Sequence, residues 1–360
     1  MTTLVAGATG FLGGHLTRAL VQRGRRVRAL VRPSSRVAPL IAQNVEIVTG
    51  FIENRADVLR AAEGVETIYN AAGAFRTFAQ PDSYFFGVNA RGVENILEAA
   101  RQHGVARTIH TSTIGVHGDV PQIPCTEDSP LNPGDAYQRS KAEGDIRARE
   151  AFRRADPPGV VVRPASMYGP GDLRFLKLFR SVQRGTFCLF GDGRTLFHGI
   201  YIDDLVDAML LCGEHPEAVR SEVFILAGPR WVTLSELVTL VAQAVGAPPP
   251  RWRLPIGPLL AASRACELLC RPLGIEPPLH PRRAHFFINN RAFSTDKARR
   301  ILGFVPRVDM PEGIARTALW YVRQGLIRPT DAPERMLAEL ERRDHGPADA
   351  AAPQAAPSAA

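Results

Sequence analysis

The 360-residue chain has few cysteines and no long apolar run, and each absence narrows the class of protein. No apolar stretch approaches the roughly 20 residues that a membrane-spanning helix needs. The first apolar strand begins at residue 2 or 3, which leaves no room for a signal peptide, so we expect a cytoplasmic protein with no membrane span. The five cysteines are too scattered for a disulfide framework. Cys266 and Cys270 lack a second ligand pair, so we interpret them as buried thiols and predict no metal site.

The most informative segment lies at the N-terminus. The apolar run Thr2 to Ala6 reads as a buried strand, and it leads through Gly7-Ala8-Thr9-Gly10-Phe11-Leu12-Gly13 into a helical pattern. The first glycine permits the tight turn, the second allows phosphate oxygens to approach the backbone, and the third lets helix and strand pack closely. The helix N-terminus then offers free N–H groups to an anion. The segment therefore predicts a dinucleotide site at Gly7, Thr9, Gly10, Phe11, Leu12 and Gly13.

Positive charge is concentrated close to this motif. The formal net charge of the chain is +8, and six arginines lie between residues 23 and 36. No interleaved aromatics and no recognisable nucleic-acid module accompany them, so we expect no nucleic-acid partner. Attraction for an anionic cofactor explains the placement of these arginines better.

The first half of the chain alternates strands and helices, which predicts an α/β fold with a doubly wound parallel sheet of the Rossmann type. We expect a dinucleotide-binding domain over residues 1–168 and a smaller substrate-binding lobe over 169–330, with a soft boundary because later strands can return to the sheet. Residues 345–360 read as a disordered tail. The expected strands are Thr2–Ala6, Arg26–Val31, Val45–Thr49, Thr67–Ala71, Arg107–Ser112, Val160–Arg163, Ile200–Ile202 and Val223–Leu226, and the expected helices include Tyr84–His103, Tyr137–Phe152 and Leu234–Val245.

Tyr137 and Lys141 are four residues apart at the start of an expected helix, so both project from one face. A lysine ammonium beside a phenol lowers the pKa of the phenol and makes it a usable acid or base. The strand Arg107–Ser112 brings Ser112 and Thr113 to the carboxyl edge of the sheet, where such sheets bind ligands. This set suits hydride transfer, with the tyrosine handling the proton and a hydroxyl holding the substrate oxygen.

The chain resembles the extended short-chain dehydrogenases/reductases, the superfamily of NAD(P)-dependent epimerases, dehydratases and 3β-hydroxysteroid-type dehydrogenases. The resemblance covers about residues 3 to 325. Besides the glycine turn, it rests on Asn70-Ala71-Ala72-Gly73, Asn89-Ala90-Arg91-Gly92, Thr111 to Gly118, Tyr137-Gln138-Arg139-Ser140-Lys141, Arg163-Pro164, Tyr168 to Asp172, and Gly191-Asp192-Gly193 before Asp203-Asp204.

The resemblance implies a role for each matching residue. Tyr137 is the implied acid/base, and Lys141 lowers its pKa and holds the nicotinamide ribose. Counting five residues back from Gly118 gives Thr113 as the catalytic hydroxyl, with Ser112 as the alternative. The implied cofactor contacts also include Ala71, Ala72 and Gly73 and the segment Pro164–Met167, with Ser166 and Met167. Dimerisation through the two long helices is typical of the family, so a homodimer is a possible assembly.

The chain departs from the family pattern at three places. Family members that use NAD carry an acidic residue at the end of the second strand, whereas this chain has Arg32, which favours NADP(H) over NAD(H) because a guanidinium binds a phosphate bidentately. Arg36 and nearby serines are secondary candidates. Phe51 stands where relatives have an aspartate for the adenine. Phe197 stands where nucleotide-sugar enzymes have a diphosphate-binding arginine.

Three functions follow from these patterns. The preferred one is an NADP(H)-dependent oxidoreductase that interconverts a secondary alcohol and a ketone on a small apolar or lipid-like molecule. The first alternative is a nucleotide-sugar epimerase or dehydratase. The second is a non-catalytic NADP(H) sensor, which the presence of both Tyr137 and Lys141 disfavours. Two further features stay open: the apolar segment Leu254–Pro278 either walls a pocket or packs as a helix on the main lobe, and Arg282, Arg283 and Arg291 either bind a phosphate or cover a solvated face.

Overall fold

The structure is a computed structural model that describes residues 2–75, 80–120, 122–214, 219–270, 284 and 286–344. The predicted disordered tail lies outside these residues, as do Arg282, Arg283 and the C-terminal part of the apolar segment Leu254–Pro278.

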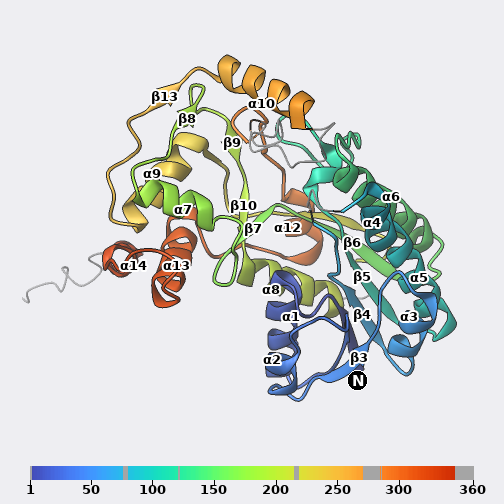
Figure 1. The fold of residues 1–360 in the computed structure, drawn as a ribbon. Coiled ribbons are helices and arrows are strands. Elements are labelled where there is room, and N and C mark those ends of the chain that lie inside the picture. The colour runs from blue at the N-terminus through green and yellow to red at the C-terminus, as the bar shows by residue number, and fades with distance from the viewer. Residues whose placement is uncertain are drawn as a thin grey trace, which may run out of the picture.

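Seven parallel strands form one sheet, which confirms the Rossmann-type α/β prediction (Figure 1). In spatial order they are β11 (Val223–Leu226), β6 (Gly159–Pro164), β5 (Arg107–Thr111), β4 (Thr67–Asn70), β1 (Thr2–Ala6), β2 (Arg26–Val31) and β3 (Glu46–Thr49). The strand order reverses between β1 and β4, because the chain leaves β3 at one edge and returns to the other side of β1. Ligands bind at such a reversal, outside the carboxyl ends of the strands.

Helices cover both faces of the sheet. On one face α1 (Phe11–Gln22) packs against α8 (Ile202–Glu214), and on the other α3 (Arg55–Ala62), α5 (Gly92–Gln102) and α6 (Ala136–Arg153) lie side by side (Figure 1). Leu4 and Val5 are adjacent on β1 yet belong to different hydrophobic clusters. Successive side chains of a strand point to opposite faces, so a strand that is buried on both faces must be apolar throughout.

The expected helix Tyr84–His103 is divided into three pieces. It consists of α4 (Asp82–Phe86), a π-helical stretch Gly87–Arg91 and α5. The apolar face that the sequence indicates is nevertheless kept, since Ile96 and Ala99 are fully buried. A π-helical turn shifts the phase of the helix and occurs mostly at functional sites. Here it contains Asn89, whose contacts are described below.

The second lobe follows β6. It contains β7 (Ser166–Tyr168), β8 (Leu189–Phe190), β9 (Leu196–Phe197), β10 (Gly199–Tyr201), β12 (Val232–Thr233) and β13 (Arg253–Leu254), paired as β10–β7, β12–β9 and β13–β8. Its helices are α7 (Leu176–Gln183), α9 (Leu234–Ala244), α10 (Ile256–Cys270), α13 (Met310–Arg323) and α14 (Ala332–Asp344). Shorter helices are α2 (Ala38–Ile41), the 3₁₀ helix Ile114–His117, and α12 (Asp296–Leu302), which packs on β11.

The two late strands have different outcomes. Val223–Leu226 does return to the main sheet, where it forms β11 beside β6. The strand expected at Ile200–Ile202 forms as β10 but does not return to this sheet: β10 pairs with β7 in a separate two-stranded sheet, and Ile202 already begins α8. The interpretation of Cys266 and Cys270 as buried thiols is also wrong, since both are half-buried, one turn apart on α10. Within the described ranges, no helix has both the length and the apolar character to cross a bilayer.

Candidate active site

The glycine turn between β1 and α1 brings two distant backbones together. Gly7 has a φ of +87°, a conformation that favours glycine, and its carbonyl accepts a hydrogen bond from the N–H of Gly10 at 2.9 Å. A Cβ on Gly7 would lie 2.7 Å from the backbone nitrogen of Ala72, at the end of β4. A Cβ on Gly13 would overlap the carbonyl of Gly7, at 2.6 Å from its carbon. The turn therefore has room for backbone only, and α1 begins directly after it with its first N–H groups exposed to an incoming anion.

This crowding gives a prediction with an internal control. Replacing Gly13 by alanine forces two backbones apart, so we expect the free energy of unfolding to fall by about 1–3 kcal/mol. Gly14→Ala adds the same methyl group at the next position, where its Cβ would lie 3.5 Å from the carbonyl oxygen of Ala8. We expect that variant to stay within about 0.5 kcal/mol of the parent. Urea denaturation followed by circular dichroism measures both, and equal stability of the two variants would contradict the packing argument.

A first cleft of about 460 Å³ lies outside the carboxyl ends of β1, β2 and β4. Predicted cofactor residues that line it are Gly7, Thr9, Gly10, Arg32, Ala71, Ala72 and Gly73. Ser35, Phe51 and Glu53 line it as well, whereas Arg36 is exposed and is not part of the lining. The Arg32 guanidinium donates to the hydroxyl of Tyr84 at 3.5 Å. Of the other predicted cofactor residues, Leu12 is buried in the core and Phe11 packs edge-on against His15. Gly13, the last of the predicted cofactor residues, lies against the backbone of Gly7 and leaves no room for a Cβ there.

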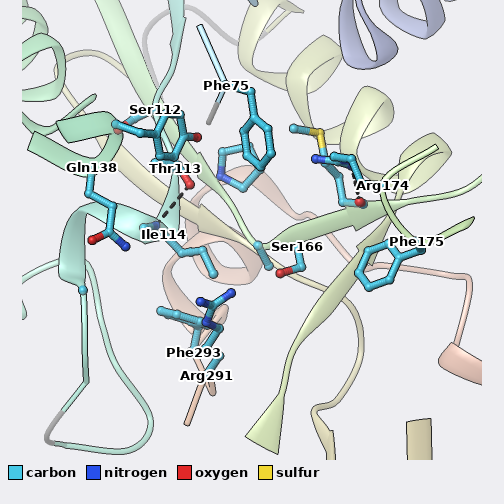
Figure 2. A pocket seen from close by; sticks show the side chains of 16 residues that line it. Phe75, Ser112, Thr113, Ile114, Gln138, Ser166, Arg174, Phe175, Arg291 and Phe293 are labelled. Atoms are coloured by element: carbon cyan, nitrogen blue, oxygen red, sulfur yellow. Dashed lines mark hydrogen bonds between the residues drawn. The ribbon is translucent and has the colours of Figure 1, made fainter. Parts of the chain in front are cut away.

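A second cleft of about 210 Å³ adjoins the first, since Phe75 lines both. The structure brings Ser112, Thr113, Tyr137, Pro164, Ser166 and Met167 to its wall, all of them predicted site residues. Figure 2 shows Phe75 and Arg174 on one side of this cleft and Arg291 and Phe293 on another. Residues from three distant stretches thus meet at one place, whereas Lys141, the other predicted catalytic residue, is not part of this lining.

Lys141 is buried beneath the junction of the two clefts. Its ammonium donates to the carbonyl oxygen of Thr111 at 2.6 Å, and a Cβ on Gly73 would lie 3.8 Å from its nitrogen. Burial lowers the pKa of Lys141 to about 8, although the nearby Asp145 carboxylate acts to raise it. The lysine is therefore still mostly protonated at neutral pH, within reach of a ligand on the glycine-rich floor.

The candidate hydroxyls sit at the end of β5. The Thr113 hydroxyl oxygen caps the 3₁₀ helix by accepting the N–H of Gly115 at 3.1 Å (dashed line in Figure 2), so its own O–H can still donate into the cleft. Ser112 is 4% exposed and lines the same cleft. Both alternatives that the sequence leaves open are compatible with this geometry, and Thr113 is the more accessible of the two.

Tyr137 is half-buried in the first turn of α6, and its ring packs edge-on against Phe75, with 5.3 Å between the centroids. A capping box fixes the start of the helix: the Asp135 carboxylate accepts the N–H of Gln138 at 2.8 Å, and the Gln138 side chain reaches back to the N–H of Asp135. The position of the phenol is thus set by the helix start and by one aromatic neighbour.

A buried ion pair joins α6 to β6. Arg163 and Asp145 are both 0% exposed and form a two-pronged pair, with nitrogen–oxygen distances of 2.9 and 2.8 Å. Burial acts to raise the pKa of Asp145, but the hydrogen bonds and charge of Arg163 bring it below the ordinary value. Arg163 also donates to the carbonyl of Glu127 at 3.1 Å and contacts the His117 ring nitrogen at 3.2 Å. Lys141 and Asp145 lie one turn apart on α6, so this pair holds the lysine in place.

Two buried side chains complete the support. Asn89 donates to the carbonyl of Ala74 and to the Ser140 hydroxyl, and its oxygen accepts the N–H of Ala74 at 2.9 Å. It therefore ties the segment after β4 to α6. His110 lies beside Asn70, and burial, aided by the charge of Lys141, lowers its pKa to about 3. The imidazole is neutral at any pH at which the protein works.

Several residues that line the second cleft have no predicted role in the site. Phe75, Ile114, Arg174, Phe175 and Phe293 reach it from four places in the chain. Arg291, for which phosphate binding and a solvated face stay open in the sequence, also lines this cleft. Local spacing carries no signal for most of these residues, because they meet only after the lobe has folded. Phe75, two residues beyond Gly73, and Ile114, directly after Thr113, are the exceptions that proximity to a motif could have found. The described residues of the segment Leu254–Pro278 are not part of the lining.

Comparison with known proteins agrees with this geometry. Residues 3–227 match the NAD dependent epimerase/dehydratase family. The chain is 34% identical to sterol demethylase protein B of Methylococcus capsulatus, across 91% of this chain and 100% of that protein. It is 30% identical to a 2-alkyl-3-oxoalkanoate reductase of Stenotrophomonas maltophilia, across 88% of this chain and 98% of that protein.

A solved structure shows the same architecture. The dTDP-glucose 4,6-dehydratase of Streptomyces venezuelae, crystallised as a double mutant with NAD bound, superposes with a TM-score of 0.73 at 25% identity, covering 91% of this chain and 99% of that one. The family match spans the glycine turn, the first cleft, and the second cleft apart from Arg291 and Phe293. The chain therefore belongs to the NAD dependent epimerase/dehydratase family and is an enzyme of the extended short-chain dehydrogenase/reductase type.

Proposed function

We propose that this enzyme transfers a hydride between NADP(H) and a secondary alcohol or ketone on an apolar, lipid-like molecule. The observation that carries the proposal is the lining of the second cleft, where Phe75, Ile114, Phe175 and Phe293 surround the candidate catalytic groups. These four apolar side chains suit a hydrocarbon body beside the polar catalytic groups. The printed names of the sterol demethylase protein and the alkyl-oxoalkanoate reductase support the same substrate class.

Position 197 supports the choice of substrate. Nucleotide-sugar enzymes of the superfamily place a diphosphate-binding arginine there, whereas Phe197 is buried and packs edge-on against Phe175, with 5.8 Å between the ring centroids. Arg174 and Arg291 line the cleft from other directions, so a substrate with one anionic end, such as an oxo acid, fits the charge of the wall. Arg174 is itself held by the Asp172 carboxylate at 2.7 Å.

Each group has an assigned task in this proposal. A bound nicotinamide supplies or accepts the hydride. Tyr137 donates the proton to the carbonyl oxygen during reduction and takes it back during oxidation. The Lys141 ammonium stabilises the phenolate and holds the ribose, and the Thr113 hydroxyl orients the substrate oxygen, with Ser112 as the alternative. Pro164, Ser166 and Met167, which line the second cleft, would border the nicotinamide ring.

A substrate comparison tests this function. We expect a long-chain 2-alkyl-3-oxo acid to drive oxidation of NADPH, followed by absorbance, while UDP-glucose and dTDP-glucose are recovered unchanged by nuclear magnetic resonance. The family match and the dehydratase structure favour the second candidate function, a nucleotide-sugar epimerase or dehydratase. Conversion of either sugar without net consumption of cofactor would establish that alternative and overturn the oxidoreductase proposal.

The preference for NADP(H) rests on Arg32, which lines the first cleft at the end of β2, where a ribose 2′-phosphate would lie. Arg32→Glu removes a charge-assisted contact and adds repulsion, so we expect the Kd for NADPH to rise by at least about tenfold. The Kd for NADH should change far less, because NADH has no 2′-phosphate. Fluorescence titration of the reduced nicotinamide measures both.

Arg36→Glu is the matched control, since it makes the same charge change at an exposed position outside the cleft lining. It should leave both dissociation constants near those of the parent. Equal weakening of NADPH and NADH by Arg32→Glu would show that Arg32 does not read the phosphate.

A further inference from the structure

One surface of the second lobe exposes large apolar side chains. It consists of the segment Arg251–Leu254 and helix α10, and we call it the α10 surface. Leu268 and Leu269 are 73% and 72% exposed, and Trp252 is 69% exposed. Of the fifteen residues of α10, all of which the structure describes, Ser263 alone is buried. In Figure 1 the helix lies at the rim of the lobe, away from the seven-stranded sheet.

The exposed Trp252 side chain belongs to an ordered part of the backbone. The carbonyl of Trp252 accepts the N–H of Leu189 at 3.0 Å, and β13 pairs with β8, so the backbone under the exposed indole is fixed. Monomeric soluble proteins rarely leave contiguous apolar side chains in water, and a patch of this kind marks a contact with something else. The sequence leaves open that this helix packs on the main lobe. Leu268 and Leu269 do not pack there, because both are exposed.

The charges on the α10 surface have one dominant sign. Arg251, Arg253 and Arg264 are exposed, and Glu267 is the acidic residue among them. Over residues 251–270 the sequence has three arginines and one glutamate, a net charge of +2, and two of these arginines flank Trp252. A leucine-rich helix that follows an exposed tryptophan between two arginines combines the residue types that favour a membrane interface.

We propose that the α10 surface binds the interface of a membrane that contains anionic lipids, with α10 lying in the plane of the bilayer. Fifteen residues of helix span about 22 Å, which is too short to cross the hydrocarbon core. A second copy of this chain is a poorer occupant: a two-fold interface brings the same patch of each copy together and would set arginines against arginines.

The α10 surface is linked to the wall of the second cleft through a strand pairing and a ring contact. The Phe190 ring, next to β13, contacts Phe287, with 5.3 Å between the centroids, and the same segment continues to Arg291 and Phe293 in the cleft lining. An enzyme held to a membrane by this surface would have its substrate cleft close to a source of lipid-like molecules. The membrane proposal does not depend on the proposed activity, but the two agree.

Vesicle flotation of the full chain tests the proposal. We expect the parent protein to bind vesicles of phosphatidylcholine with phosphatidylglycerol at least about tenfold more tightly than vesicles of phosphatidylcholine alone. Leu268→Glu/Leu269→Glu should abolish binding to both, and Arg251→Glu/Arg253→Glu should remove the preference for anionic vesicles. Ile41→Glu, at a 58% exposed position on α2, is the matched control and should bind like the parent.

Two further measurements decide the remaining outcomes. The circular dichroism spectrum and the urea midpoint of the leucine variant should equal those of the parent, which shows that the lost binding is not a loss of folding. Failure of the parent to bind either vesicle, or equal loss in the Ile41 control, overturns the proposal. A change from dimer to monomer in the leucine variant, seen by analytical ultracentrifugation without any vesicle binding by the parent, would identify the surface as a contact between copies instead.

Discussion

Tyr137→Phe is expected to lower kcat by a factor of about 10²–10⁴, the usual contribution of a positioned acid or base. The substitution removes one hydroxyl and keeps the ring, so the edge-on contact with Phe75 at 5.3 Å is retained. The affinity for NADPH should stay within a few-fold of the parent, because the glycine turn and Arg32 hold the cofactor in our proposal. Steady-state kinetics and fluorescence titration measure the two effects separately.

A matched control is available in the first cleft. Tyr84→Phe removes the same hydroxyl from a residue that receives a hydrogen bond from Arg32 at 3.5 Å. It should alter cofactor affinity modestly and leave kcat near that of the parent. If Tyr137→Phe kept its turnover, the acid/base role would belong to another group, and the proposed mechanism would be wrong.

Asp145→Leu is expected to lower the free energy of unfolding by about 3–5 kcal/mol, because it leaves the Arg163 charge buried without its partner. Both side chains are fully buried and paired through two hydrogen bonds. The double variant Asp145→Leu/Arg163→Met should recover most of the loss, since a well-packed apolar pair is often as stable as a buried ion pair. Urea denaturation of the three proteins measures the difference, and equal stability of the single and double variants would contradict this account.

The same ion pair is expected to influence the pH dependence of catalysis. Asp145 acts to raise the pKa of Lys141, which burial lowers to about 8. The lysine must be protonated to stabilise the phenolate, so activity should fall as the pH rises through this pKa. Asp145→Asn keeps the shape and removes the negative charge, so the alkaline limb of the kcat profile should move to lower pH. An unchanged limb in a folded Asp145→Asn protein would show that the carboxylate does not act on Lys141.

Local patterns in the sequence predict most strands of the sheet. The segment Arg26–Val31 is bounded by turn residues and ends in three buried apolar side chains, and it forms β2 with the predicted limits. Ile200–Ile202 has the same apolar character, but pairing is decided by a partner elsewhere in the chain, and here that partner is β7. The π-helical stretch Gly87–Arg91 is invisible to periodicity for a related reason: it adjusts one turn so that Asn89 meets Ala74 and Ser140.

The candidate site also contains residues that local sequence predicts and residues that it does not. Gly7, Gly13, Tyr137 and Lys141 are predictable because a turn or a helix spacing dictates each of them within a few residues of chain. The cleft that they serve is not predictable in this manner. Its wall is made by side chains more than a hundred residues apart in sequence, such as Phe75 and Phe293, and no local pattern requires them to meet.

The sequence by itself determined the nucleotide-binding turn, the alternating sheet and the tyrosine–lysine helix, because each of these depends on steric and hydrogen-bonding rules that act over short stretches of chain. Only the tertiary structure decided which rings and arginines wall the substrate cleft, that Arg163 pairs with Asp145, and that Leu268 and Leu269 of α10 face solvent instead of the core. Those outcomes depend on which distant surfaces pack together, since burial is a property of the whole fold and not of a segment.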